Sequence, residues 1–187
     1  NQARATFETP LAAACCKGHP ENVTALLAAN ADVNQASNDG GAAPLHFACH
    51  EGHTDIVTKL IDANANLNQA DNNGTTPLYF ACLEGQTEVV TTLLAADADV
   101  EQVNNRGGTP LIVTCMKGHT EIATKLLAAN ANVNHADENG DTPLYNACMY
   151  GHTEIVTMLL VANADVDGDE TFDSWPMMAA CDHGHLG

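Results

Sequence analysis

Apolar and polar residues alternate along this chain in short blocks whose spacing fits amphipathic helices. In one block, Leu78, Ala81 and Cys82 stand at positions i, i+3 and i+4, which lie on one face of a helix. Pro77 precedes them, and proline is favoured in the first turn, where no backbone N–H is needed. The pattern therefore predicts a short helix that begins at Pro77 and stops at Gly85.

A second apolar block follows after a few residues. We predict that it begins at Thr87 as the N-cap, with the carboxylate of Glu88 in the positive first turn. Its buried face is predicted to consist of Val89, Val90, Leu93 and Leu94. Neither short helix can bury its apolar stripe alone, so the pattern predicts helix pairs that stack side by side.

The two-helix unit recurs along the whole chain. Prolines stand 34, 33, 33, 33 and 33 residues apart, at Pro10, Pro44, Pro77, Pro110, Pro143 and Pro176. A cysteine follows each proline after five residues: Cys15, Cys49, Cys82, Cys115, Cys148 and Cys181. Glycine with His or Gln follows three residues later, at Gly18-His19, Gly52-His53, Gly85-Gln86, Gly118-His119, Gly151-His152 and Gly184-His185. Such a period indicates a stack of structural repeats.

The best single unit reads Ala43-Pro44-Leu45-His46-Phe47-Ala48, followed by Gly52-His53-Thr54-Asp55-Ile56-Val57. It resembles the ankyrin repeat, whose unit of about 33 residues carries a Thr-Pro-Leu-His-x-Ala signature on a turn and two helices. The resemblance covers essentially the whole chain. It implies an all-α solenoid of stacked helix–turn–helix units with hairpin tips, with about five full repeats and a C-terminal half-repeat.

We expect one domain over residues 1–187, with repeats 4–36, 37–70, 71–103, 104–136 and 137–169 and a partial repeat 170–187. The opening Asn1-Gln2-Ala3 reproduces the end of a unit, as in Asn34-Gln35-Ala36, so we expect the chain to be a fragment of a longer array.

The sequence departs from the family pattern at two kinds of position. The glycine that usually follows the second helix is replaced by Asn30, Asn64, Asp97, Asn130 and Asn163. Asn is the next-best residue for the left-handed conformation needed there, and Asp tolerates it less well. The other departure is Gly40-Gly41, where one inserted residue is predicted to lengthen a turn tip without shifting the helices.

Charge restricts the class of partner. The 24 acidic and six basic residues give a net charge of −18, whereas phosphate backbones and anionic membranes require rows of Lys and Arg. We therefore expect a protein or peptide partner of basic or mixed charge, and no nucleic acid, membrane or small-molecule substrate. We also expect a monomer.

The seven cysteines are too few and too regularly spaced for a secreted disulfide scaffold. Equivalent cysteines of neighbouring repeats are predicted to be too far apart to pair, because packed helices lie roughly 8–10 Å apart. This indicates a reducing, cytoplasmic location. Cys16 lies outside the regular row, and we predict that it is the most reactive thiol.

Three clusters of residues suggest metal binding or catalysis, but each has a simpler interpretation. His46, Cys49, His50 and His53 have spacing that could hold zinc, yet most of them are repeat framework positions. Asp165, Asp167 and Asp169 resemble a calcium loop, but Glu170 stands where that loop needs glycine. Cys181-Asp182-His183 could suggest a nucleophile, but its cysteine belongs to the repeated packing row. We therefore predict no metal, no cofactor and no catalytic residue.

The resemblance places ligands in a groove formed by the turn tips and the first helices. The candidate groove residues are His50, Tyr79, Leu83, Glu84, Arg106, Met116, Lys117, Glu138, Tyr145, Met149, Tyr150 and Phe172. They vary while the framework repeats, and Tyr and Met are enriched at interfaces. We predict a binding scaffold without enzymatic activity.

Two alternatives stay open at this point. The repeats could be the substrate-recruiting or regulatory part of a larger enzyme, channel or secreted bacterial effector, or they could be a mechanical spacer. If the source is eukaryotic, Asn34 and Asn134 are also candidate targets of the asparaginyl hydroxylase that acts on ankyrin repeats, and a turn-stabilising role is the alternative.

Overall fold

The computed structural model describes residues 9–167 of the chain. This part contains ten α-helices and, within residues 9–167, no strand, which confirms the all-α prediction. The chain divides into two compact units, with the boundary between Asp99 and Val100, and each unit is described by itself. Residues 170–187, the predicted partial repeat, lie outside the described residues.

Each repeat contributes a first and a second helix. In unit 1 the helices are α1 (Pro10–Lys17), α2 (Pro20–Ala28), α3 (Pro44–Glu51), α4 (Thr54–Asp62), α5 (Pro77–Leu83) and α6 (Thr87–Ala95). In unit 2 they are α7 (Pro110–Lys117), α8 (Thr120–Ala128), α9 (Pro143–Met149) and α10 (Thr153–Val161). Odd numbers are first helices and even numbers are second helices.

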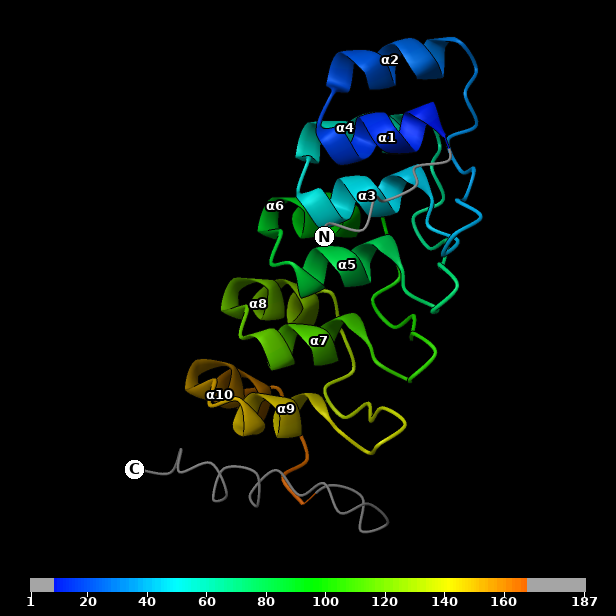
Figure 1. The fold of residues 1–187 in the computed structure, drawn as a ribbon. Helices are drawn as coiled ribbons and strands as arrows, with labels where there is room; N and C mark the ends of the chain where they lie inside the picture. The colour runs from blue at the N-terminus through cyan, green and yellow to red at the C-terminus, as the bar shows by residue number, and fades with distance from the viewer. Residues whose placement is uncertain (1–8, 168–187) are drawn as a thin grey trace, which may run out of the picture. The chain divides into compact units, whose positions relative to one another are not determined.

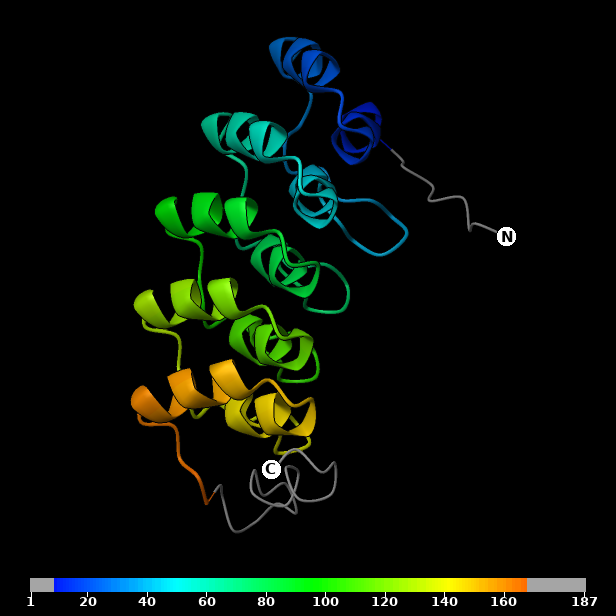
Figure 2. The same ribbon diagram turned by 90° about the vertical axis from the view of Figure 1, so that its left-hand side faces the viewer.

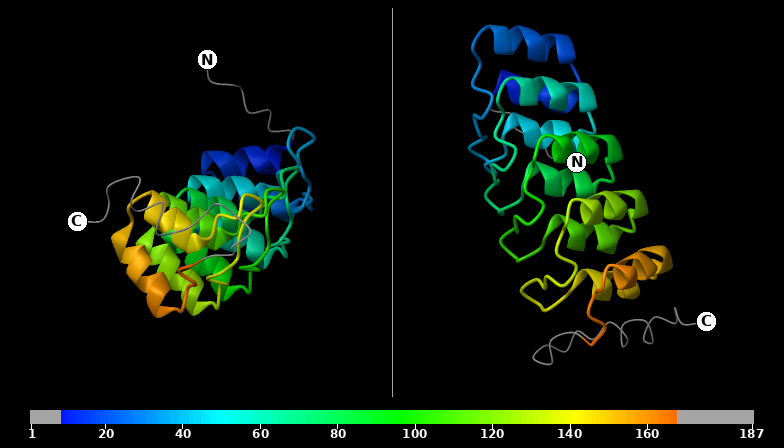
Figure 3. Two further views of the ribbon diagram at one scale, coloured as in Figure 1. Left: turned by 90° about the horizontal axis from the view of Figure 1, so that it is seen from below. Right: turned by 180° about the vertical axis from the view of Figure 1, so that it is seen from behind.

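Within each unit the first helices form one layer and the second helices form another (Figures 1 and 2). In unit 1, α3 packs between α1 and α5, and α4 packs between α2 and α6. In unit 2, α7 packs on α9 and α8 packs on α10. The loops that join one repeat to the next project from one side of each unit, as the view from behind shows (Figure 3). This loop side is where the turn tips lie.

The core of each unit is built from the apolar stripes that the sequence predicts. Fully buried residues include Leu11, Leu45, Leu78, Ile56, Leu60 and Leu93 in unit 1 and Leu111, Ile122, Leu126, Ile155 and Leu159 in unit 2. Burying one such side chain contributes about 1.5–3 kcal/mol. Leu94, predicted to be buried, is only half-buried because it lies at the edge of its stripe.

The first helices begin as the prolines predict, with proline in the first turn of each. A threonine caps four of them, and its Oγ1 accepts a hydrogen bond from the N–H three residues later: Thr9, Thr76, Thr109 and Thr142. The prediction of Thr87 as the N-cap of a second helix is wrong. α6 begins at Thr87, and its N-cap is Gln86, whose side chain makes no capping bond and is directed to another repeat instead.

The second helices end in left-handed residues, which confirms the predicted caps. Asn30, Asn64, Asp97, Asn130 and Asn163 have φ values of 60°, 61°, 62°, 63° and 62°. At the end of α2 the Asn30 N–H donates to the Leu27 carbonyl, and the Ala31 N–H donates to the Leu26 carbonyl. This pairing is the Schellman motif, which satisfies carbonyls that the helix leaves open.

The inserted glycine changes only the turn tip, as predicted. In a regular tip the Asp71 N–H donates to the Thr75 carbonyl (2.9 Å). In the lengthened tip the Ser37 N–H donates to the Ala42 carbonyl (2.9 Å), which encloses one more residue. Gly40 and Gly41 both have positive φ, so the extra residue forms a tight loop that side chains would strain.

Candidate partner-binding surface

His46 ties one turn tip to the next within unit 1. The Ala43 N–H donates to its Nδ1 (3.0 Å), and its Nε2–H donates to the Thr75 carbonyl (3.1 Å). The ring is only 2% exposed, and burial lowers the pKa of His46 despite these backbone bonds. Both ring nitrogens are therefore engaged with the backbone, and His46 acts as a structural histidine.

The glycine after a first helix makes room for a side chain of the following repeat. A Cβ built on Gly118 would lie 2.4 Å from Cε1 of His152. The Nε2–H of His152 donates to the Met116 carbonyl at 3.3 Å. In unit 1, Gln86 has the same role, and its amide donates to the His50 carbonyl at 3.1 Å. These contacts fix the exposed ends of neighbouring first helices relative to each other.

Asparagine side chains form a second link between repeats. Oδ1 of Asn34 accepts from the Asn66 N–H (2.7 Å), and Oδ1 of Asn134 accepts from the Asp165 N–H (2.8 Å). Glu101 takes the same place in its repeat and accepts from the Asn132 N–H (2.8 Å). These contacts favour a structural role for Asn34 and Asn134, in which each joins successive repeats.

In unit 1 the candidate groove residues lie at the ends of α3 and α5. His50 bridges two carboxylates, with Nδ1 3.1 Å from Glu51 Oε1 and Nε2 3.7 Å from Glu84 Oε1. Tyr79 in the first turn of α5 and Leu83 at its end are half-buried. The structure therefore brings His50 and Glu84 together, and it adds Glu51 to the predicted set.

In unit 2 the corresponding surface is less acidic and more apolar. Met116 and Met149 are half-buried at the ends of α7 and α9, two helices that pack on each other, and Lys117 is exposed. Tyr150 is 52% exposed, and its ring stacks on His152 with centroids 6.5 Å apart. An exposed aromatic ring beside methionine is typical of interface anchors.

The turn tips supply the remaining candidate residues of unit 2. The Glu138 N–H donates to the Arg106 carbonyl at 3.0 Å, so two neighbouring tips are joined through their backbones. The side chains of Arg106 and Glu138 are exposed, and Tyr145 is half-buried at the start of α9. Phe172, the last predicted groove residue, lies outside the described residues.

The thiols of the cysteine row are buried. Cys15, Cys49, Cys82 and Cys115 are fully buried, Cys148 is half-buried, and these five and Cys16 are free thiols. Burial raises the pKa of Cys15 and of Cys115 to about 12. The pKa of Cys16 is also raised, first by partial burial and then by the Glu51 carboxylate, while Lys17 lowers it. Among the described thiols, Cys16 and Cys148 are therefore the two with partial access to solvent.

The described residues of the clusters that suggested metal chemistry make other contacts. Asp165 Oδ1 accepts from the Asp167 N–H at 3.1 Å, which closes a turn. Within residues 9–167 no three His, Cys, Asp or Glu side chains are grouped to hold a metal ion. Asp169, Cys181, Asp182 and His183 lie outside the described residues.

Sequence reasoning missed a cavity of about 230 Å³ in unit 1. Its walls include Phe47 and Phe80, which occupy the same position in two consecutive repeats, and Cys16. The sequence feature that could have indicated the cavity is the pair of aromatic residues at this position, which holds Ala13, Val113 and Asn146 in the other described repeats. Their side chains are half-buried, as for residues that line a surface hollow.

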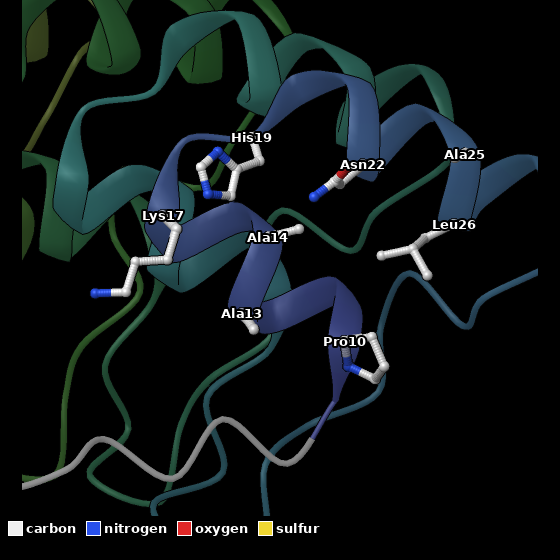
Figure 4. Close-up of a pocket in the computed structure, with 8 residues that line it drawn as sticks. All are labelled: Pro10, Ala13, Ala14, Lys17, His19, Asn22, Ala25 and Leu26. Atoms are coloured by element: carbon white, nitrogen blue, oxygen red, sulfur yellow. The ribbon is translucent and has the colours of Figure 1, made fainter.

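A larger and more open hollow of about 530 Å³ lies against α1 and α2, where Leu26, Asn22 and Ala25 face Pro10, Ala13 and Ala14 (Figure 4). The positions equivalent to Ala14, Asn22 and Leu26 in the second repeat are Ala48, Ile56 and Leu60, which are fully buried. In that repeat they are covered by helix stacking. The hollow is therefore the face of the first repeat whose equivalent in the second repeat is covered by helix stacking, and Lys17 also lines it.

None of the described helices has the length and apolar character needed to cross a membrane. Comparison with curated proteins gave no match. The sequence pattern of the family described as Ankyrin repeats (3 copies) matches residues 11–104 and 96–170, which together cover most of the chain. Ankyrin repeats are generally protein–protein interaction modules and are typically non-catalytic. On its stacked helix pairs and this match, the chain belongs to the ankyrin-repeat family.

Proposed function

We propose that the chain is a scaffold that binds a protein or peptide through the ends of its first helices and its turn tips, without catalysing a reaction. One observation carries this proposal. No two described repeats carry the same pair of residues before the first-helix glycine: Cys16-Lys17, His50-Glu51, Leu83-Glu84, Met116-Lys117 and Met149-Tyr150. The framework around them keeps a glycine after each first helix, a left-handed Asn or Asp after each second helix and a buried apolar core.

Framework and surface residues are under different physical constraints. The glycines and left-handed asparagines are constrained by backbone geometry, and the core residues by packing density. Exposed side chains such as His50 and Tyr150 are not needed for either purpose. Their differences between repeats therefore supply the specificity of the proposed scaffold.

The charge of the chain supports a basic or mixed-charge partner. With a net charge of −18, a positively charged partner is attracted over long range, mainly through a faster association rate. This steering weakens as salt is added, because the screening length falls to about 8 Å at physiological ionic strength. Contacts with Met149 and Tyr150 would be much less sensitive to salt.

The proposal is tested by selecting peptides from a random displayed library on the full chain. In each unit, one variant removes first-helix side chains: His50→Ala with Leu83→Ala in unit 1, and Met149→Ala with Tyr150→Ala in unit 2. We expect every selected peptide to lose at least about fivefold in affinity with one of these variants, which corresponds to about 1 kcal/mol per interface anchor.

The matched controls change exposed second-helix positions, Asp55→Lys on α4 and Glu154→Lys on α10. They are expected to change affinity only through a salt-sensitive association rate. Peptides that lose binding with these controls and keep it with both first-helix variants would place the binding surface on the opposite side.

A further inference from the structure

The cavity that Phe47 and Phe80 help to form is the size of a side chain rather than of a cofactor. Its volume of about 230 Å³ is below the roughly 300–1,000 Å³ of typical ligand pockets. It lies among α1, α3 and α5, all in unit 1, and Cys16, His46, His50 and Glu51 also line it. Phe80 meets His46 and His50 edge-on, with ring centroids 5.9 and 6.0 Å apart, so its position is held from two sides.

The rim of this cavity carries negative charge. The Glu51 and Glu84 side chains are about two-fifths exposed, at 42% and 39%, and both contact the ring of His50. The Glu51 contact lies at hydrogen-bond distance, whereas the Glu84 carboxylate is 3.7 Å from the ring. Each carboxylate offers about four lone-pair sites, so the two together present more acceptor positions than the two ring nitrogens of His50 can fill.

A second charge acts at the α1 end of the cavity. Oε1 of Glu51 lies 4.0 Å from Sγ of Cys16, and Lys17 follows Cys16 directly in the sequence. Lys17 is exposed. The carboxylates of Glu51 and Glu84 therefore outnumber this one lysine in the surroundings of the cavity.

We propose that this cavity receives an arginine side chain of the bound protein or peptide, an inference that rests on the proposed function. The phenyl rings of Phe47 and Phe80 form an apolar wall, Glu51 also lines the cavity, and Glu84 lies beside it in contact with the lining residue His50. Arginine suits this combination because its planar guanidinium stacks on aromatic rings and presents five donors that match carboxylates.

Other ligand classes fit less well. Anions would be repelled by Glu51 and Glu84. A metal ion would need three or more grouped ligands, and within the described part of the chain no such group exists. The compact ammonium of lysine is strongly hydrated and cannot make the paired donor contacts of a guanidinium.

The test uses the full chain as the bait for the random displayed library, with Glu51→Gln/Glu84→Gln as a parallel bait. We expect a group of peptides that binds the wild-type chain and is lost from the double variant, and these peptides share an arginine at a fixed position. Replacing that arginine by citrulline, which is nearly the same shape but neutral, is expected to lower affinity at least tenfold. Phe47→Leu is expected to weaken the same peptides and to spare those without the arginine.

Two control variants make the result specific. Asp55→Asn/Glu88→Gln removes two exposed carboxylates from second helices of the same unit, so it matches the charge change of Glu51→Gln/Glu84→Gln and should change affinity only through the salt-sensitive association rate. Lys17→Met keeps most of the side-chain stem but removes its charge, and it should raise affinity for the arginine peptides. Equal thermal unfolding of the two carboxylate double variants checks that the fold is kept.

The inference is overturned if the selected peptides carry no fixed arginine, carry a fixed lysine instead, or bind the Glu51→Gln/Glu84→Gln bait as well as the wild-type chain. Equal affinity of the arginine and citrulline forms would also overturn it. In each of these cases peptides are still selected, and the proposed binding function stands. If no peptide is selected on any bait, the proposed function itself fails and the inference fails with it.

Discussion

The two units carry the same framework but different surfaces. Both end their second helices in left-handed Asn or Asp, and both place a side chain of the following repeat over a first-helix glycine. At the ends of its first helices, unit 1 presents His50, Glu51 and Glu84 together with Cys16, Lys17 and Leu83, whereas unit 2 presents Met116, Lys117, Met149 and Tyr150. The same kinds of caps and glycines therefore support an acidic, aromatic surface in unit 1 and a more apolar surface in unit 2.

This difference separates the residues that determine stability from the residues that determine which ligand is bound. Changing a framework residue should change stability to a similar extent in either unit. Changing a surface residue should alter affinity for one kind of ligand and leave stability nearly unchanged.

The largest effects are expected in the shared core. Leu60 in unit 1 and Leu126 in unit 2 occupy the same repeat position and are both fully buried. Replacing either by Ala should lower the free energy of unfolding by about 2–5 kcal/mol, from lost burial and the remaining cavity. Urea denaturation measures this. Leu26→Ala is the matched control, because Leu26 has the same position but is only half-buried, and it should cost clearly less.

An effect of up to similar size should distinguish the units at the position of His46, because unit 2 has Ile112 and Tyr145 in its place. His46→Leu leaves the Ala43 N–H and the Thr75 carbonyl without this partner, at about 1–3 kcal/mol for each group that stays buried. His50→Leu, at an exposed position one turn later, is the control and should change stability little. Equal urea midpoints for wild type and His46→Leu would contradict the structural role.

The contribution of His46 to the free energy of unfolding should also depend on pH. Burial lowers its folded-state pKa below the ordinary value, so the unfolded chain binds the proton more readily. The stability that neutral His46 provides is therefore complete above about pH 6.5, the ordinary histidine pKa. It falls as the pH drops from there toward the lowered folded-state pKa. The stability difference between wild type and His46→Leu should shrink over that range, and a difference that grows on acidification would contradict this account.

The smallest effect is expected at the left-handed caps. Asp97→Gly in unit 1 and Asn130→Gly in unit 2 remove the strain of a Cβ at positive φ, each with a gain below about 1 kcal/mol. Asp tolerates this conformation less well than Asn, so the gain at Asp97 should be larger. Thermal unfolding of the two variants gives the comparison. A lower midpoint for both would contradict the role of the left-handed cap.

Much of the framework could be predicted from the sequence, because positions that need a particular backbone conformation accept only a few residue types. The prolines mark the first turns, and Asn30 and its equivalents occupy the left-handed positions. Thr87 was assigned wrongly as a cap because threonine caps the first helices here, whereas the residue before the second helix is used to contact another repeat.

The surface was harder to predict from the sequence. The pairing of His50 with Glu51 and Glu84 joins residues of two repeats, and their contact depends on side-chain rotamers that no local pattern reports. The cavity beside Phe47 and Phe80 was missed for the same reason, since a hollow arises from what neighbouring helices leave unfilled. The sequence does show that these positions vary, and variation alone does not reveal the shape that results.

The most direct test of the binding surface is paramagnetic broadening of the amide signals of the labelled full chain by a selected peptide that carries a nitroxide. The account predicts strong broadening at residues 50–51 and 83–84 of unit 1, or at residues 116–117 and 149–150 of unit 2. Thr58, Thr91, Thr124 and Thr157, exposed at one repeated position of the second helices, should keep their intensity. Broadening that is strongest at these threonines and absent from the first-helix ends would contradict it.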